Sequence, residues 1–437
     1  MGTEKKLVNV ILTQQGDIRN IGEYALLRSE VDFLNEIFDE LQISVLTFYP
    51  ERLRRMEPTL ESYSPLIDLK IRGKDRSFLL LLPFVLFFQT MLTCISLAML
   101  KVNLKPIYRP KVLEKFKHAD IVIAGGTQAF NEGSLLQRRQ SIAARATNLF
   151  VLFWGVYEVF ITKKILRKPF ITFPQSIGPF RSWIGKRGIQ YILCNADAVL
   201  LREDYTLRLL EGIKKKAAIH IAADMAFLFK ESAKTSRDLP RPVIGVSPCF
   251  PHSFSQKQQE DYVKAHAKAL DYMVGKYAVS IVFMPSVVGQ GETEKREKAR
   301  DDLEVCRMIF QNMVHQNKSE MICAATPDEF VSLVEQLDML IPTRMHPSIL
   351  AATKHVPFVA IIYEHKQKGL LKKLGVESLA MDVNEVTFEK LRSRVEYVWN
   401  ERTRIRHSLS LKVPMVQRQT ATLVKQVISV YLSATKQ

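Results

Sequence analysis

Short apolar runs alternate with amphipathic stretches through the first half of the chain. The runs that we predict to be buried strands are 7–13, 43–48, 120–124, 170–173 and 198–201. Between the first two, residues 26–41 carry apolar side chains at helical spacing. Strands that alternate with helices are typical of a parallel sheet covered by helices, so the pattern predicts an α/β domain.

The alternation stops at a polar stretch and then resumes. Residues 231–242 contain prolines and show no periodicity, which is typical of a linker. Further apolar runs follow at 243–247, 279–284, 339–341 and 358–362. A chain of 437 residues is long enough for about two domains. We therefore predict an N-terminal Rossmann-like domain over 1–235, a C-terminal one over 236–414, and a last helix over 415–437.

One apolar run departs from this pattern. Residues 78–100 contain no charge and are long enough to span a bilayer. Basic residues flank the run on both sides, at Lys70, Arg72, Lys74, Arg76, Lys101, Lys105, Arg109 and Lys111. A single span would place positive charge on both sides of the membrane and would split the domain. We predict an in-plane or hairpin helix on the inner face of the cell membrane, the alternative being a core helix. The apolar run 148–162 could join it or be core.

Charge and cysteine content narrow the location and the partners. The net charge of +17 favours anionic partners, and no nucleic-acid-binding module is recognisable, so we favour phosphates and acidic lipid over nucleic acid. Five cysteines include no C-x-x-C pair, which fits a reducing compartment. The N-terminus shows no signal peptide. We expect a cytoplasmic protein at the membrane surface.

Candidate chemistry gathers after two neighbouring apolar runs. Arg344 and His346 follow the run 339–341, and Pro347 is expected to open a helix. Lys366 follows the run 358–362. Ligands of open α/β sheets bind at the carboxyl ends of strands, where these side chains would hold an anion and transfer a proton. The alternative is that they are ordinary polar groups at strand ends.

Three loops in the first half offer further candidates. Arg202 ends the run 198–201 and is a second candidate anion ligand. The other loop residues that we expect to face a ligand are Asn20, Gly22, Gly125, Gly126 and Gln128. Glycine leaves the backbone amides open to a ligand, although the same residues are common in tight turns.

These segments resemble the polysaccharide pyruvyl transferase family. The strongest likeness is strand-R-M-H-helix at 339–351 followed by V-P-F-V-A-I-I-Y-E-H-K-Q-K-G at 356–369. N-I-G-E-Y-A at 20–25, S-I-G-P-F at 176–180 and D-M-A-F at 224–227 extend it. The family usually carries Asp at Glu23 and Gly at Thr127, so these two positions depart from the pattern. The likeness covers roughly residues 7–375.

The resemblance implies an activity. Members of this family transfer a pyruvyl group from phosphoenolpyruvate to sugar hydroxyls and form a ketal, in a two-domain fold similar to GT-B with a cleft between the domains. For such a donor we expect Arg344, Arg202 and Lys366 to hold the carboxylate and phosphate by charge-assisted hydrogen bonds. We expect His346 to be the general acid, because an ordinary histidine titrates near neutral pH. The acceptor saccharide, which a membrane-bound enzyme could take in lipid-linked form, would lie against the loops 20–22 and 125–128. No metal and no cofactor is required.

Two other functions remain open on the sequence. A GT-B glycosyltransferase using a nucleotide-sugar would explain Glu377 and Glu385, which have the E-x7-E spacing of some retaining enzymes, but the glycine-rich context is absent. A non-catalytic membrane-bound protein that binds a saccharide would fit the departures at Glu23 and Thr127.

Overall fold

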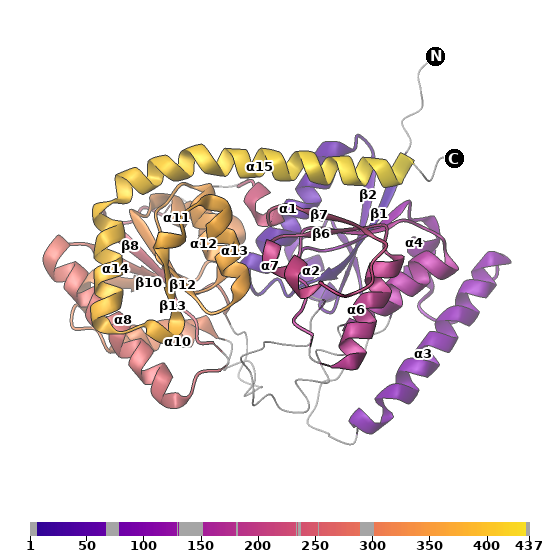
Figure 1. The fold of residues 1–437 in the computed structure, drawn as a ribbon, viewed down its shortest axis with the longest axis horizontal. Helices are drawn as coiled ribbons and strands as arrows, with labels where there is room; N and C mark the ends of the chain where they lie inside the picture. The colour runs from indigo at the N-terminus through magenta and orange to yellow at the C-terminus, as the bar shows by residue number, and fades with distance from the viewer. Residues whose placement is uncertain are drawn as a thin grey trace, which may run out of the picture. The chain divides into compact units, whose positions relative to one another are not determined.

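The computed structural model forms two compact units of the α/β class, as the sequence predicts (Figure 1). It describes residues 7–66, 78–128, 130, 152–180, 182–232, 234, 237–251, 253–288 and 301–433, with the backbone alone at 78–86 and 365. Unit 1 comprises Met1–Asp17, Glu30–Ala222 and Thr422–Gln437. Unit 2 comprises Ile18–Ser29 and Ala223–Ala421.

Unit 1 contains a parallel seven-stranded sheet in the order β3-β2-β1-β4-β5-β6-β7. Its strands are β1 (Val8–Gln15), β2 (Leu41–Thr47), β3 (Glu61–Tyr63), β4 (Ile121–Ala124), β5 (Phe170–Thr172), β6 (Ala198–Leu201) and β7 (Ala218–Ile221). The five predicted runs correspond to β1, β2, β4, β5 and β6. The edge strands β3 and β7 are only three or four residues long and partly exposed, so they gave no apolar signal.

Helices cover this sheet. They are α2 (Pro50–Met56), α3 (Phe78–Lys101), α4 (Pro110–His118), α6 (Trp183–Asn195) and α7 (Asp204–Leu209), with a further helix over 152–160 that ends in a π-turn, η1 (Ile161–Ile165). Helix α4 buries Val112, Leu113 and Phe116 in the core of the unit. Within the run 148–162, Trp154 and Tyr157 are buried, so the described part of that run is core.

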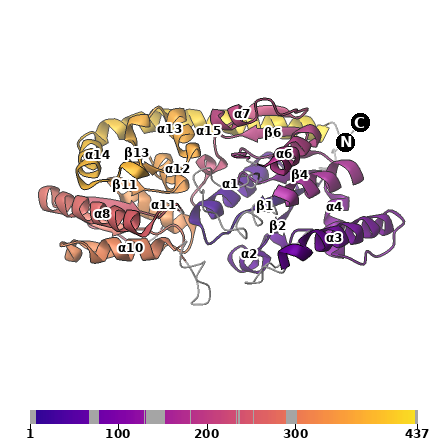
Figure 2. The same cartoon turned by 60° about the horizontal axis from the view of Figure 1, so that its bottom comes forward.

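Helix α3 lies along α4 at the periphery of unit 1 (Figure 2). It buries Thr93, Ser96 and Leu97, whereas Phe87 and Phe88 on its outer side are exposed. No helix within the described residues is long and apolar enough to cross a membrane. The basic positions 70, 72, 74 and 76 lie outside the described residues.

Helix α1 (Ile21–Ile37) is divided between the units after Ser29. The loop before it, expected within a first domain over 1–235, packs in unit 2. The backbone amide of Ile21 donates to Ser286 O at 2.9 Å, and Asn20 bridges Val287. Arg28 forms an ion pair with Asp328 at 3.0 Å. These contacts explain why the unit boundaries differ from the predicted domain boundaries.

Unit 2 contains a parallel sheet in the order β10-β9-β8-β11 and a parallel pair, β12-β13. The strands are β8 (Val243–Ser247), β9 (Ser280–Phe283), β10 (Ser319–Met321), β11 (Met339–Pro342), β12 (Ala360–Ile362) and β13 (Ala380–Asp382). A single parallel bridge from Leu340 to Phe358 adjoins the pair to β11. Parallel sheets of this kind carry ligand sites at the carboxyl ends of their strands.

The helices of unit 2 are α8 (Gln256–Tyr277), α10 (Asp302–Gln311), α11 (Pro327–Gln336), α12 (Met345–Thr353), α13 (His365–Leu374) and α14 (Phe388–Asn400). Helices α8 and α10 lie side by side (Figures 1 and 2). Two of these helices begin at side-chain caps: Ser255 forms a capping box with Gln258, and the Thr326 side chain accepts from Glu329 N.

The last helix, α15 (Arg402–Ser433), begins earlier than the predicted 415. Pro414 lies inside it, and a proline is normally a helix breaker. Residues of this helix form hydrogen bonds within each unit. The Thr420 hydroxyl accepts from Ala223 N in unit 2, and the Tyr431 hydroxyl donates to Asp197 O in unit 1.

Candidate functional site

Arg344 stands at the carboxyl end of β11, at the position directly before the first residue of α12. Its Nε and Nη2 donate to the two carboxylate oxygens of Asp302, each at 2.7 Å. Asp302 is 1% exposed and also accepts from Ser286 Oγ and Val287 N, both at 3.0 Å. Burial disfavours the charged guanidinium, but the Asp302 carboxylate outweighs this effect and keeps the pKa of Arg344 well above its usual value. The cation is therefore fixed, with Nη1 making no hydrogen bond inside the described part of the chain.

His346 lies in the first turn of α12, which begins at Met345 and not at Pro347 as predicted. The imidazole is nearly buried, and its Nε2 lies 3.9 Å from Asp224 Oδ2. Asp224 is itself buried and accepts from Ala226 N at the start of the short helix η2 (Met225–Leu228). The sequence resemblance pointed to this aspartate segment but not to its place beside His346.

The loop 20–22 packs on His346. A Cβ atom built on Gly22 would lie 2.3 Å from His346 Cβ and 2.4 Å from Nδ1, so only glycine fits. The Asn20 side chain accepts from Gly22 N at 3.0 Å and shapes the turn. Asn20 and Gly22, expected on the acceptor side of a different domain, thus lie in the same unit as His346.

Lys366 belongs to the first turn of α13, after β12. Its Nζ lies 2.6 Å from Glu364 Oε2. The neighbouring Gln367 is 2% exposed, donates to Thr343 O at 2.8 Å and accepts from Tyr363 N at 3.0 Å. Gln367 therefore ties the turn before Arg344 to the loop that carries Lys366, a role with no signal in the sequence.

Cys249 is a buried thiol of unit 2, and a thiol near a candidate site has to be considered as a nucleophile. Burial raises its pKa to about 12, although the Arg344 charge acts in the opposite direction. A thiol with this pKa stays protonated at neutral pH, and only the thiolate is an effective nucleophile. Cys249 therefore does not suit covalent catalysis.

Arg202 lies in unit 1, whereas Arg344 and Lys366 lie in unit 2. It is 5% exposed, and its Nε donates to Ser176 Oγ at 2.6 Å. Its Nη1 donates to Gly126 O at 3.3 Å. The arginine predicted to bind the donor is thus in contact with the glycine turn predicted to bind the acceptor.

The glycine turn after β4 is held by its own unit. Gly125 N donates to Thr13 O at 2.8 Å, and Gly126 N donates to the buried Glu30 carboxylate at 2.6 Å. A Cβ atom on Gly125 would lie 2.3 Å from the Gln15 side chain. Both amides are engaged, so a ligand would contact other atoms of this turn. Gln128 donates to Gly178 O at 3.1 Å.

A second buried carboxyl group lies near this turn. Glu158 is fully buried and accepts from Thr13 Oγ1, Trp154 Nε1 and Gln14 Nε2. Burial raises its pKa to about 8, against the effect of these hydrogen bonds. The group is therefore mostly neutral at pH 7, and the sequence gave no reason to single it out.

No group of three or more His, Cys, Asp or Glu is arranged to hold a metal ion among the residues described. The side chains in unit 2 suit a different chemistry. The Arg344 guanidinium is held by Asp302, the His346 imidazole lies beside Asp224, and the Lys366 ammonium is in the first turn of α13, after the next strand. Such a set can bind an anion and move a proton.

Comparison with known proteins agrees with the motifs. Residues 20–365 match the family described as polysaccharide pyruvyl transferase. The amylovoran biosynthesis protein AmsJ of Erwinia amylovora is 23% identical over 400 residues, which cover 87% of this chain and 89% of that protein.

Solved structures show the fold. The UDP-GlcNAc 2-epimerase of Neisseria meningitidis, solved with UDP-GlcNAc bound, is 10% identical with a TM-score of 0.54 and covers 97% of this chain and 99% of its own. The UDP-GlcNAc 2-epimerase of Methanocaldococcus jannaschii is 14% identical with a TM-score of 0.52 and covers 90% and 93%. At such identities the likeness concerns the fold alone. The family match spans most of the chain and includes the segments around Arg344 and His346, and on this basis the protein belongs to the polysaccharide pyruvyl transferase family.

Proposed function

We propose that the protein transfers a pyruvyl group from phosphoenolpyruvate to two hydroxyls of a saccharide, giving a pyruvate ketal. The observation that carries the proposal is the arrangement at the start of α12. Arg344 is held by Asp302 at two points, and His346 lies two residues on, beside Asp224. A fixed cation next to a proton donor suits a substrate that carries a carboxylate and a phosphate.

The residues have distinct tasks in this scheme. Arg344, through Nη1, and Lys366 bind the anionic groups of the donor. His346 gives a proton to the methylene carbon, which makes C2 electrophilic. One saccharide hydroxyl then bonds to C2 and returns its proton to His346. The C2–O bond to phosphate breaks, and a second hydroxyl bonds to C2 and gives its proton to the departing phosphate. The products are the ketal and inorganic phosphate, so atoms and charge balance without a metal or a redox step.

Arg202 is our proposed second anion ligand for the donor. Its contacts to Ser176 and to Gly126 O hold the guanidinium in one place, which lowers the entropy lost on binding. Asn20, Gly22, Gly125, Gly126 and Gln128 are our proposed acceptor-side residues. Because AmsJ is named for the biosynthesis of amylovoran, we propose that the acceptor belongs to exopolysaccharide or cell-surface polysaccharide synthesis.

We also propose that the enzyme works at the inner face of the cell membrane on a lipid-linked saccharide. The support is the outer side of α3 and the connection to α4, which expose Phe87, Phe88, Val102, Leu104 and Ile107. Lys101, Lys105 and Lys111 lie beside these apolar residues in the chain. An apolar face bordered by lysines matches the interface of an acidic leaflet.

The proposal is tested by following phosphate release from phosphoenolpyruvate with a saccharide acceptor, together with the mass of the product. We expect wild-type protein to release phosphate only with acceptor present and to form a product of ketal mass. His346→Gln should fold, bind phosphoenolpyruvate in a melting experiment and lose turnover. His407→Gln, on the exposed part of α15, is the matched control and should keep full turnover.

Two outcomes would overturn the assignment. The first is stabilisation by a nucleotide-sugar and not by phosphoenolpyruvate, which would indicate a glycosyltransferase. The second is stabilisation by saccharide with unaltered behaviour of His346→Gln in every assay, which would indicate a binding protein.

A further inference from the structure

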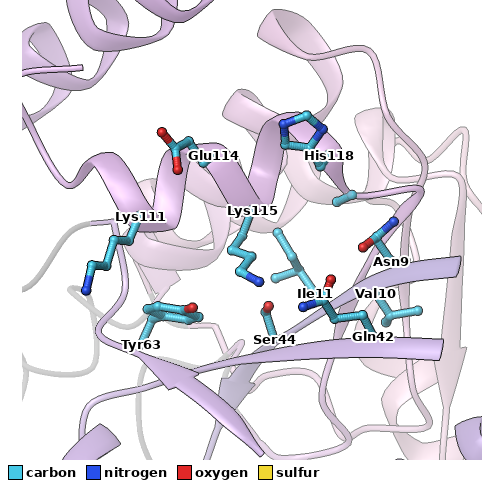
Figure 3. Close-up of a pocket in the computed structure, with 11 residues that line it drawn as sticks. Asn9, Val10, Ile11, Gln42, Ser44, Tyr63, Lys111, Glu114, Lys115 and His118 are labelled. Carbon is cyan, nitrogen blue, oxygen red and sulfur yellow. The ribbon is translucent and has the colours of Figure 1, made fainter. Parts of the chain in front are cut away.

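Unit 1 contains a hollow whose lining includes none of the candidate site residues. It has a volume of about 400 Å³ and lies between α4 and the strands β1, β2 and β3 (Figure 3). A second hollow, of about 340 Å³, adjoins it, since Glu114 and His118 line both. The second hollow extends to Leu100 and Leu104 at the end of α3.

The first hollow is polar on both sides. The sheet contributes Asn9, Gln42, Ser44 and Tyr63, while α4 contributes Lys111 and Lys115 one turn apart, together with Glu114 and His118 (Figure 3). Amide and hydroxyl groups suit hydroxyls of a ligand, and ammonium groups suit a phosphate.

The charges in the hollow are arranged unequally. Lys115 Nζ lies 2.5 Å from Glu61, a carboxylate that also accepts from Gln42 and Ser44, so this lysine is fixed in the hollow wall. Lys111 has no ion-pair partner within the described residues and is exposed. Lys117, in the second hollow, donates to Leu100 O at 3.2 Å. An incoming anion would therefore meet Lys111 as an unneutralised charge.

The far end of the second hollow is apolar. Leu104 is 57% exposed, and Val102 and Ile107 on the same connection between α3 and α4 are exposed as well. A polar, basic hollow thus continues into an exposed apolar surface. A polar, basic site that borders an apolar surface suits an amphiphilic ligand whose headgroup carries a negative charge and hydroxyl groups.

We propose that the two hollows bind the headgroup of an acidic phospholipid that carries a phosphodiester and free hydroxyls. The phosphate contacts Lys111, the hydroxyls bond to Gln42 and Asn9, and the chains leave past Leu104. This inference rests on the proposed association with the membrane and goes beyond it, because it predicts selection among lipids of equal charge. It is independent of the pyruvyl transfer chemistry.

The test uses full-length protein and sedimentation with vesicles of phosphatidylcholine containing either phosphatidylglycerol or phosphatidylserine at equal mole fraction. Both acidic lipids carry one net negative charge, but only phosphatidylglycerol offers a free diol. We expect wild type to bind phosphatidylglycerol vesicles more tightly. Lys111→Gln should weaken that binding about fivefold, the effect of one lysine at a membrane surface. Gln42→Leu should remove the preference without altering the charge.

The control is Lys215→Gln, an exposed lysine of unit 1 outside both hollows, with the same change of charge. It should keep the preference. Equal binding to both acidic lipids by wild type would overturn the headgroup site and leave membrane association standing. Binding to no vesicle would overturn both, while phosphate release with a soluble acceptor would still report on the transferase. Thermal stabilisation by glycerol 1-phosphate without vesicle preference would replace the lipid by a soluble ligand and so contradict the proposal.

Discussion

Arg344 and Asp302 form an ion pair through two parallel hydrogen bonds of 2.7 Å, and Asp302 lies at the first position of α10. The same carboxylate holds Ser286 and Val287, the residues that bind the loop 20–22 in place. Asp302 therefore positions two parts of the candidate site, the anion-binding guanidinium and the glycine loop on His346.

Asp302→Asn removes one charge and one of the two acceptors for Arg344. We expect KM for phosphoenolpyruvate to rise about tenfold with a smaller change in kcat, because a displaced Arg344 weakens the substrate and the transition state alike. The midpoint of thermal unfolding should fall, since a charged hydrogen bond of this kind contributes about 1.5–3 kcal/mol. Asp338→Asn is the matched control: Asp338 also pairs an arginine and accepts a backbone amide, but it does not touch Arg344. A normal KM in Asp302→Asn would contradict this role.

Gly22→Ala should displace the imidazole of His346. The new Cβ would meet His346 Cβ and ring atoms at 2.3–2.4 Å, closer than atoms can approach. A catalytic group moved by about 1 Å typically costs on the order of a hundredfold in rate. We expect a loss of that size in turnover with phosphoenolpyruvate binding largely kept. Gly275→Ala in α8 is the control, because a Cβ atom there has no neighbour within 4 Å and alanine favours a helix. If both variants turn over alike, Gly22 is not needed to position His346.

The raised pKa of the buried Glu158 carboxyl group predicts that the stability of the fold depends on pH. Burial raises its folded pKa to about 8, above the ordinary value of 4.5, so the unfolded chain loses this proton first as pH rises. Its contribution to the free energy of unfolding is greatest below about pH 4.5 and declines up to about pH 8. Denaturant titrations of wild type and Glu158→Gln should therefore diverge in favour of the variant across this window, by at most about 1.4 kcal/mol per pH unit. Glu51→Gln, at an exposed carboxylate, should track wild type. Parallel curves for Glu158→Gln would mean that the carboxyl is ionised in the fold.

Substitutions on the outer side of α3 should change membrane binding without changing the stability of the fold. Phe87 and Phe88 are 71% and 55% exposed, so Phe87→Ser and Phe88→Ser should leave the unfolding free energy within about 0.5 kcal/mol. Each should weaken binding to acidic vesicles by roughly tenfold or more, because burying a phenylalanine contributes about 1.5–3 kcal/mol. Leu97→Ala, on the buried side, should behave in the opposite way and lose about 2–5 kcal/mol of stability. Unchanged vesicle binding by both serine variants would exclude this side as the membrane contact.

The sequence predicts where the helices and strands of this protein form better than it predicts which residues contact one another in the fold. Fully buried strands such as β4 and β6 are visible in the sequence as unbroken apolar runs. The helix caps at Ser255 and Thr326 involve residues only three positions apart in the chain. The contact of Asp302 with Arg344 joins residues 42 positions apart, and nothing in the local pattern of α10 indicates it. Likewise, the loop 20–22 follows β1 directly, so only its tertiary contacts reveal that it belongs to unit 2. The same holds for Arg202, whose place beside Gly126 depends on the order of strands in the sheet.

The division of α1 after Ser29 has a consequence for dissection of the protein. Each unit is assembled from separate stretches of chain: residues 18–29 belong to unit 2 while the residues on both sides belong to unit 1, and residues 422–437 return to unit 1 after a stretch of unit 2. A fragment covering 223–421 would contain Arg344 and His346 but would lack the glycine that fits against the imidazole. A fragment ending at 222 would carry that glycine without its histidine. Complementation by co-expressed fragments would therefore have to restore the contact of the loop 20–22 with His346 between the two fragments. Insertion of a tag or a protease site between Asp17 and Asn20 would loosen the attachment of this loop to unit 1.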